Sequence, residues 1–222
     1  MRFFYEKGFK MKNIFLYGAN CTSIVWDELL LLMDNSDNLI IEYPHEITEK
    51  AETVKDVAQW VYDTYGGDLN CDCIIGHSMG GIIALDLITN FGISCQKVIL
   101  IESNLKPAEK FYRNLMTPEN MAKYGKKIIP MIKAEAPFYA DKLKQSLQND
   151  FDFTDLIRKS AIEIHGIYGD RGEGNYKDRI SDLNLGKDIE SNINFHFIKD
   201  CCHMPMVENP AALAEMLKDI CQ

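Results

Sequence analysis

The chain has 222 residues, with 24 lysines and arginines against 33 aspartates and glutamates and a net charge of −9 at pH 7. Hydrophobic residues form 46% of the sequence and charged residues 26%, the balance of a soluble globular protein, and the length favours one domain. The acidic balance argues against a nucleic-acid-binding protein, and no apolar run approaches the roughly 18–20 residues that span a bilayer, so stable membrane insertion is not expected.

Targeting, cofactor and metal signals are weak throughout the sequence. Residues 1–13 are charged and aromatic and lack the apolar core of a signal peptide, which predicts a cytoplasmic protein. The seven cysteines are an odd number and fit free thiols. Neither Cys71 and Cys73 nor Cys201 and Cys202 have the spacing of a zinc site, so no metal is expected. No cofactor is expected either, and the sequence does not indicate an oligomeric state.

Short apolar runs recur along the chain and are the main organisational signal. They cover residues 14–17, 39–41, 73–75, 98–101, 162–168 and 193–198. Nearly continuous apolar runs of this length are typical of strands that are buried on both faces of a parallel sheet. We therefore expect most of these runs to lie side by side in one sheet.

Helical patterns separate these runs. Residues 54–65 and 79–90 carry apolar side chains at helical spacing, and the last pattern begins at Asn209, a possible N-cap, followed by Pro210. Alternation of strands and helices predicts a three-layer α/β domain over residues 1–222, with a mostly parallel central sheet.

Residues 103–160 break this alternation. They contain no good strand candidate and form several short helical patterns separated by prolines, which predicts a small helical insertion between two strands. Residues 103–150 contain nine lysines and arginines and five acids, so this part carries a net charge of +4 above an acidic body. The positive charge favours an anionic substrate, or is simply a solvated helix face.

Residues 76–80, Gly-His-Ser-Met-Gly, lie where a predicted strand ends and a predicted helix begins. This G-x-S-x-G arrangement lets the chain turn sharply, so that the Ser78 hydroxyl projects from the end of the sheet; the alternative is an ordinary N-cap serine. A serine nucleophile needs a base. Of five histidines, His203 is the best candidate because it lies in a loop directly after the last predicted strand.

Together these motifs resemble the α/β-hydrolase fold, in particular its lid-bearing serine hydrolases, the esterases and lipases. The resemblance rests on residues 76–81, on residues 203–210, which are similar to the segment around the catalytic histidine, and on residues 17–20. It implies that Ser78 and His203 are catalytic, that the backbone N–H groups of Ala19 and Met79 form the oxyanion hole, and that residues 103–160 form a helical lid. Two positions depart from the family: Tyr17 replaces a usual histidine, and Cys202 a usual glycine.

The triad acid is less clear from the sequence. The resemblance places it after the apolar run 162–168, where relatives have Gly-x-x-Asp, but this spacing ends on a glycine here. Asp170, one residue from the expected position, is the favoured acid. Glu173 in the same loop and Glu102 at the end of the preceding strand remain alternatives.

The resulting expectation is a hydrolase that cleaves a carboxylic ester or thioester of a small acyl substrate through an acyl-enzyme on Ser78. The same residues also fit a C–C hydrolase or lyase, or a non-catalytic binding protein on a hydrolase scaffold. Candidates for the substrate pocket are Tyr17, Trp26, Phe111, Tyr112, Phe138 and Tyr139, with Phe151 and Phe153 as further aromatic candidates. At least half of these aromatic residues are expected to anchor helices instead.

Overall fold

A computed structural model describes residues 12–33, 37–66, 69–148 and 150–221. Most of the N-terminal stretch that suggested the absence of a signal peptide therefore lies outside the described residues. Six strands form one sheet with the order β2-β1-β3-β4-β5-β6. They are β1 (Lys12–Leu16), β2 (Asp37–Ile40), β3 (Cys73–His77), β4 (Lys97–Ile101), β5 (Glu163–Gly169) and β6 (Asn194–Ile198).

Each predicted apolar run coincides with one of these strands. All neighbouring strands in the sheet are parallel, so the expected mostly parallel sheet is entirely parallel over the described residues. Every residue of β3 is buried, as expected for a central strand that is covered on both faces. Because all strands run the same way, the residues that follow them meet at one edge of the sheet.

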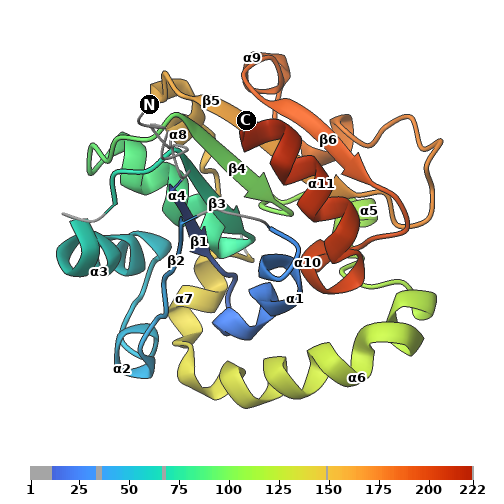
Figure 1. Cartoon of the computed structure of the whole chain (residues 1–222), viewed down its shortest axis with the longest axis horizontal. Helices are drawn as coiled ribbons and strands as arrows, with labels where there is room; N and C mark the ends of the chain where they lie inside the picture. The colour runs from blue at the N-terminus through green and yellow to red at the C-terminus, as the bar shows by residue number, and fades with distance from the viewer. Residues whose placement is uncertain (1–11, 34–36, 67–68, 149, 222) are drawn as a thin grey trace, which may run out of the picture.

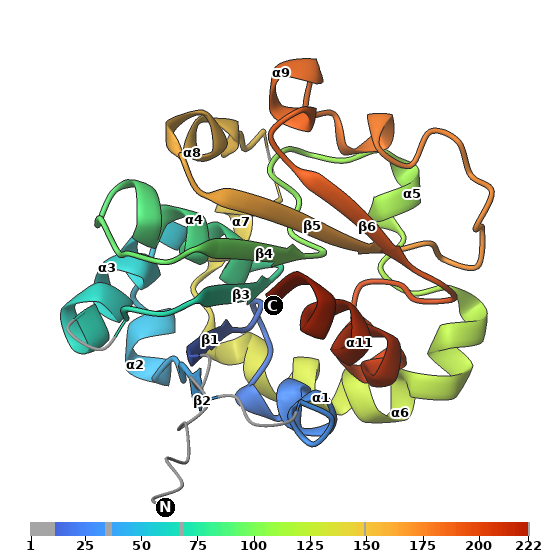
Figure 2. The ribbon, with the colours of Figure 1, turned by 45° about the horizontal axis from the view of Figure 1, so that its top comes forward.

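Helices cover both faces of the sheet, which gives the predicted three layers (Figures 1 and 2). Helices α1 and α11 lie on one face, and α3, α4 and α8 lie on the other. Outside the β4–β5 connection the helices are η1 (Ser23–Trp26), α1 (Asp27–Leu30), α2 (His45–Thr48), α3 (Val54–Tyr65), α4 (Met79–Thr89), η4 (Ser181–Leu183), α9 (Lys187–Glu190), α10 (Pro205–Glu208) and α11 (Pro210–Cys221).

Two of these helices begin at capping residues. The Thr53 side chain accepts a hydrogen bond from the backbone of Asp56, whose carboxylate binds the Thr53 backbone in return, forming a capping box at the start of α3. The Asn209 side chain accepts a hydrogen bond from the Ala212 backbone, which confirms Asn209 as the N-cap of α11.

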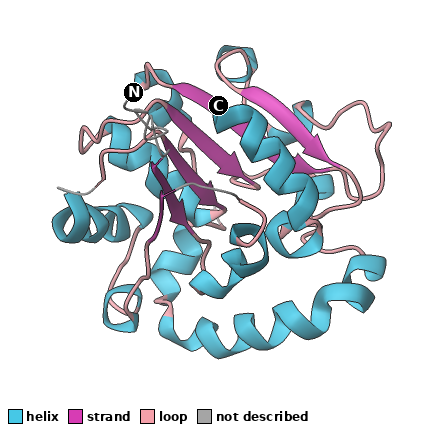
Figure 3. Ribbon diagram, viewed as in Figure 1, coloured by secondary structure: helices cyan, strands magenta, loops and turns pink. Residues whose placement is uncertain are grey.

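Residues 102–162, the β4–β5 connection, are helical as predicted. The helices are α5 (Lys110–Arg113), α6 (Pro118–Glu135), η3 (Ala136–Phe138), α7 (Asp141–Ser146) and α8 (Thr154–Lys159). The expectation that each proline separates two short helices is wrong at Pro130, which lies inside α6. Helix α6 is the long helix along the bottom of Figure 3, beyond the ends of the strand arrows. The connection therefore extends over the edge of the sheet where functional residues are expected. No helix in the described ranges has both the length and the apolar character needed to cross a membrane.

The packing of α4 against the sheet depends on glycine. A Cβ atom at Gly80 would lie 2.2 Å from the carbonyl oxygen of Leu16 in β1, far inside van der Waals contact. We expect Gly80→Ala to lower the free energy of unfolding by about 3 kcal/mol, because backbone must move to make room. Urea unfolding would measure this, with Gly66→Ala as control, since its added Cβ meets only the Tyr62 ring at 3.4 Å. Equal effects of the two substitutions would contradict the packing argument.

Candidate active site

Ser78 lies at the sharp turn between β3 and α4. Its backbone has φ 52° and ψ −119°, a left-handed conformation that is strained for a residue with a side chain. Gly18 makes the room that this turn requires, because a Cβ atom there would lie 2.9 Å from the Cβ of Ser78. The expected strand–turn–helix geometry around Ser78 is therefore present.

A cavity of about 300 Å³ surrounds Ser78 at the carboxyl edge of the sheet. His203, Glu102, Ala19 and Met79 line the same cavity, so the structure brings both expected oxyanion-hole residues and the expected base around the serine. Within the described part of the chain, the Ser78 hydroxyl makes no hydrogen bond to His203. Such a bond is often absent or long without substrate and tightens only when the reacting complex forms.

The carboxylate that contacts His203 is that of Glu102, not that of Asp170. Glu102 Oε2 lies 3.4 Å from His203 Nδ1, and the Glu102 side chain is completely buried. Glu102 directly follows β4, with a left-handed backbone (φ 48°). A carboxylate only accepts hydrogen bonds, so this contact places the proton on Nδ1 and leaves Nε2 of His203 unprotonated when the ring is neutral.

The two carboxylates after β5 have other surroundings. Asp170 Oδ1 accepts hydrogen bonds from the backbone N–H groups of Gly172 at 2.9 Å and Asp200 at 2.7 Å, so this side chain ties two loops together. Glu173 is exposed. The expected pairing of His203 with Asp170 is thus replaced by a pairing with Glu102, since Asp170 Oδ1 is taken up by the backbone N–H groups of Gly172 and Asp200.

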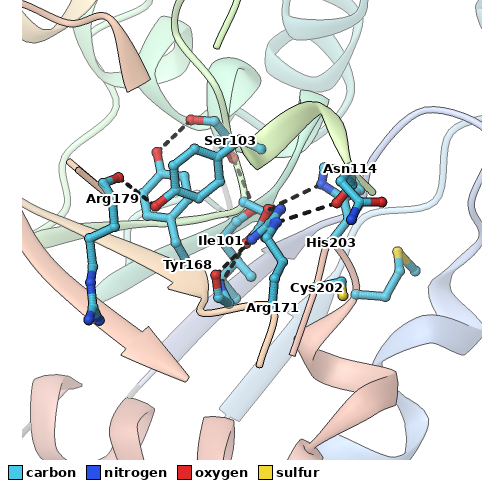
Figure 4. A network of polar contacts seen from close by, with 12 residues as sticks. Ile101, Ser103, Asn114, Tyr168, Arg171, Arg179, Cys202 and His203 are labelled. Carbon is cyan, nitrogen blue, oxygen red and sulfur yellow. Dashed lines mark hydrogen bonds and ion pairs between the residues drawn. The ribbon is translucent and has the colours of Figure 1, made fainter. Parts of the chain in front are cut away.

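Arg171 holds Glu102 from the other side. Its guanidinium makes two hydrogen bonds to the carboxylate, Nη1 to Oε1 at 2.9 Å and Nη2 to Oε2 at 2.7 Å. The Arg171 Nε also donates to the carbonyl oxygen of Asn114 at 3.3 Å (Figure 4), and the guanidinium lies 4.6 Å from the ring centre of Tyr112. A two-bond arginine–carboxylate pair of this kind fixes the orientation of the carboxylate.

This pair decides the charge of Glu102. Burial favours the neutral acid, but the positive charge and hydrogen bonds of Arg171 outweigh it and lower the pKa of Glu102 to about 2. The Gly169 N–H adds a further hydrogen bond to Oε1 at 2.6 Å. Glu102 is therefore an anion beside His203 at neutral pH.

The lowered pKa of Glu102 has a measurable consequence for stability. A carboxylate whose pKa is lower in the folded chain stabilises it above the unfolded pKa, and this contribution is lost as the pH falls towards the folded value. We expect the free energy of unfolding to drop by about 3 kcal/mol through Glu102 between about pH 4.5 and pH 2. Chemical unfolding across this pH range should show a smaller decrease in the free energy of unfolding for Glu102→Gln than for the wild type. Glu173→Gln, which changes an exposed carboxylate, should give the same decrease as the wild type. Identical slopes for all three proteins would contradict the assignment.

His77 is a site residue that the sequence analysis did not single out. It is buried, and its Nε2 donates a hydrogen bond to the carbonyl oxygen of His203 at 2.8 Å. Burial lowers the pKa of His77 to about 3, so the ring stays neutral. His77 therefore fastens the backbone of His203 to the end of β3, directly beside Ser78. In the sequence, the only indication that His77 belongs to the site was its position directly before Ser78.

The six aromatic residues expected in the substrate pocket lie elsewhere. None of them is among the described residues that line the Ser78 cavity. The side chains of four are taken up by the packed interior. Trp26 packs against Phe15, the Tyr17 hydroxyl accepts from the Tyr43 N–H, the Tyr112 hydroxyl donates to the Arg179 carbonyl, and Tyr139 is buried.

The other two of these aromatic residues lie on the surface of the β4–β5 connection or in a separate cavity. Phe138 stacks on His45 with ring centres 3.7 Å apart. Phe111 lines a larger cavity of about 830 Å³ on the outer side of Arg171. Phe151, one of the further aromatic candidates, does line the Ser78 cavity. The β4–β5 connection also contributes aliphatic and amide side chains to this cavity, namely Asn104, Leu115, Ile132, Leu147 and Gln148.

The positive charges of the β4–β5 connection are partly matched by acids of the sheet domain. Lys127 pairs with Glu28 at 2.5 Å and Lys142 with Glu52 at 2.6 Å, and these exposed pairs contribute little stability each. Lys144, which lines the Ser78 cavity, pairs with Asp141. Among the described residues, no group of three or more histidine, cysteine or acidic side chains is arranged to hold a metal ion.

Comparison with known proteins places this geometry in a known fold. No protein-family model and no curated protein matches the chain. Among solved structures, a hydrolase from Oleispira antarctica matches 97% of this chain and 92% of its own, with a TM-score of 0.75 and 13% identity. Naproxen esterase (carboxylesterase NP) from Bacillus subtilis matches 96% of this chain and 84% of its own, with a TM-score of 0.66 and 16% identity. This chain has the α/β-hydrolase fold.

A third similar structure is a membrane phospholipase A described as a bacterial virulence factor, which matches 95% of this chain and 78% of its own, with a TM-score of 0.71 and 17% identity. The fold predicted from the sequence is thereby confirmed. Identities this low establish the fold alone.

Proposed function

We propose that this protein is a serine hydrolase that cleaves carboxylic esters or thioesters, with Ser78 as nucleophile, His203 as general base and Glu102 as the triad acid. The observation that carries the proposal is the strained turn at Ser78, which opens into one cavity with His203 and a buried, ionised carboxylate. Strain at a non-glycine residue persists where the surrounding structure holds it, and it concentrates at functional sites.

The chemistry follows from the positions of these groups. His203 Nε2 takes the proton of the Ser78 hydroxyl as the oxygen attacks the acyl carbon, and the backbone N–H groups of Ala19 and Met79 stabilise the oxyanion. His203 then gives this proton to the leaving oxygen or sulfur, whose bond to the acyl carbon breaks. In the second step His203 activates a water molecule that releases the acid and restores Ser78.

Glu102 supports both steps through His203. Its carboxylate holds the Nδ1–H tautomer and stabilises the imidazolium that forms when Nε2 accepts the proton. Arg171 keeps this carboxylate charged and oriented, and so acts as a positioning residue rather than as a group that touches substrate. A triad acid placed after β4 rather than after β5 accounts for the missing Gly-x-x-Asp spacing in the sequence.

A panel of p-nitrophenyl esters and matching acyl thioesters tests the proposed reaction. We expect turnover of both classes, with one acid released for each alcohol or thiol and an initial burst where deacylation is slow. A folded protein that hydrolyses neither class would contradict the proposal. The lyase, C–C hydrolase and binding-protein alternatives would then gain support.

A further inference from the structure

The cavity around Ser78 adjoins a second cavity on the outer side of α4. The second cavity has about 380 Å³ and is lined by the start of α3, by α4, by Ser146 and by residues between 151 and 156. Ile82 and Phe151 line both cavities. Because the same two side chains line both cavities, the cavities are neighbours that share Ile82 and Phe151 as a common wall.

One row of residues on α4 leads from the first cavity into the second. Ser78 is followed by Ile82, Asp86 and Asn90 at intervals of four, so their side chains share one face of the helix. Ile82 lines both cavities, and Asp86 and Asn90 line only the second. At 1.5 Å per residue, Asp86 lies about 12 Å along the helix from Ser78.

The walls change in character along this path. The middle carries the apolar side chains Ile82, Phe151 and Phe153, and the two phenylalanine rings are 5.5 Å apart. Asp152 and Asp155 also line this cavity, and they form ion pairs with Lys106 and Arg158. The far end is polar, where the Asp86 carboxylate accepts a hydrogen bond from Asn90 and Lys55 lies on the opposite wall. An apolar wall of this kind that ends among polar groups suits an unbranched hydrocarbon chain of limited length.

The position of His203 indicates which part of a substrate enters this path. His203 directly precedes Met204 and α10, a helix that contacts α1 and α11, and its side chain must reach the leaving atom. Helix α4 lies on the face of the sheet opposite to α1 and α11. The leaving group therefore occupies the His203 side of Ser78, and the other substituent of the carbonyl, the acyl chain, lies towards Ile82.

We propose that the second cavity is an acyl-chain subsite, and that the substrates are esters or thioesters of unbranched, medium-chain fatty acids. This inference rests on the proposed function of Ser78. The path of about 12 Å to Asp86 holds a chain of about eight to ten carbons before the polar end is reached. Each additional buried methylene favours the longer ester by about fourfold while it fits.

The test is the dependence of kcat/KM on acyl length with p-nitrophenyl acetate, butyrate, octanoate and palmitate. We expect at least a tenfold rise from acetate to octanoate and a fall at palmitate. Octyl acetate carries the long chain on the alcohol, so its kcat/KM should be no higher than that of ethyl acetate. A flat acyl series, or a gain with octyl acetate alone, would overturn the acyl subsite.

Variants along the path make the test specific. Ser146→Trp introduces a large ring at a half-buried wall of the second cavity, and Ile82→Trp blocks the junction of the two cavities. In both, the ratio of kcat/KM for octanoate to that for acetate should fall at least tenfold. Gln145→Trp, at an exposed neighbour in α7 outside both cavities, should leave this ratio unchanged. Circular dichroism would establish that each variant is folded.

The outcomes separate the two proposals. An unchanged ratio in folded Ser146→Trp and Ile82→Trp proteins that still hydrolyse acetate would overturn the acyl subsite alone. Failure of the wild-type protein to hydrolyse any ester of the panel would instead overturn the proposed function, on which this inference depends.

Discussion

Replacing Ser78 by alanine should reduce ester turnover by about five to six orders of magnitude, to near the uncatalysed rate, while the protein stays folded. The hydroxyl is the only group that is lost, and alanine accepts the left-handed backbone at this position about as well as serine does. Without an oxygen to attack the acyl carbon, neither His203 nor the oxyanion hole can start the reaction. The rate of p-nitrophenyl butyrate hydrolysis measures the effect, with unfolding curves for both proteins.

Ser191→Ala is the matched control for this prediction. It removes the same hydroxyl from an exposed serine at the end of α9, outside the Ser78 cavity. It should keep the wild-type rate. Substantial turnover by folded Ser78→Ala would mean that another group attacks the ester and that the nucleophile is wrongly assigned.

The second large effect concerns the triad acid. Glu102→Gln should lower kcat by about 10³ to 10⁴, because a neutral amide neither holds the Nδ1–H tautomer nor stabilises the imidazolium of His203. Glutamine is preferred to alanine because its oxygen still accepts a hydrogen bond from Arg171. Removing the whole side chain would leave the arginine charge buried and unpaired, a cost of about 3–5 kcal/mol to folding.

Asp170→Asn separates the two candidate acids. The amide oxygen of asparagine can still accept the N–H groups of Gly172 and Asp200, so the loop is preserved and kcat should stay close to the wild-type value. A larger loss of kcat in Asp170→Asn than in Glu102→Gln would restore the acid favoured by the sequence.

Much of the fold could be predicted because its signals are local. The apolar runs at 14–17 and 98–101 are continuous in the sequence, and each must be covered on both faces, so the parallel sheet follows from them. The turn at Ser78 could be predicted for the same reason, because glycines, strand and helix all lie within a few residues. The position of His203 in the same cavity as Ser78 could be predicted from its place after the last strand.

The carboxylate of the site depends on contacts between strands that sequence does not display. Ile101 pairs with Ile167 across β4 and β5, and this register brings Glu102 next to Gly169 and Arg171. The one feature of the sequence that pointed to Glu102 was its position directly after the apolar strand β4. The sequence also does not show where an aromatic side chain points. The prediction that Trp26 and Tyr112 line the substrate pocket was therefore wrong, and both belong to the packed interior.

Reaction with a fluorophosphonate, followed by intact-mass measurement and peptide mapping, tests the central claim most directly. A phosphonylated serine forms only where a serine is activated by a base beside an oxyanion hole. We predict one adduct per chain, located on Ser78 and strongly slowed in Glu102→Gln. A folded protein that forms no adduct, or an adduct on a residue other than Ser78, would contradict this account of the site.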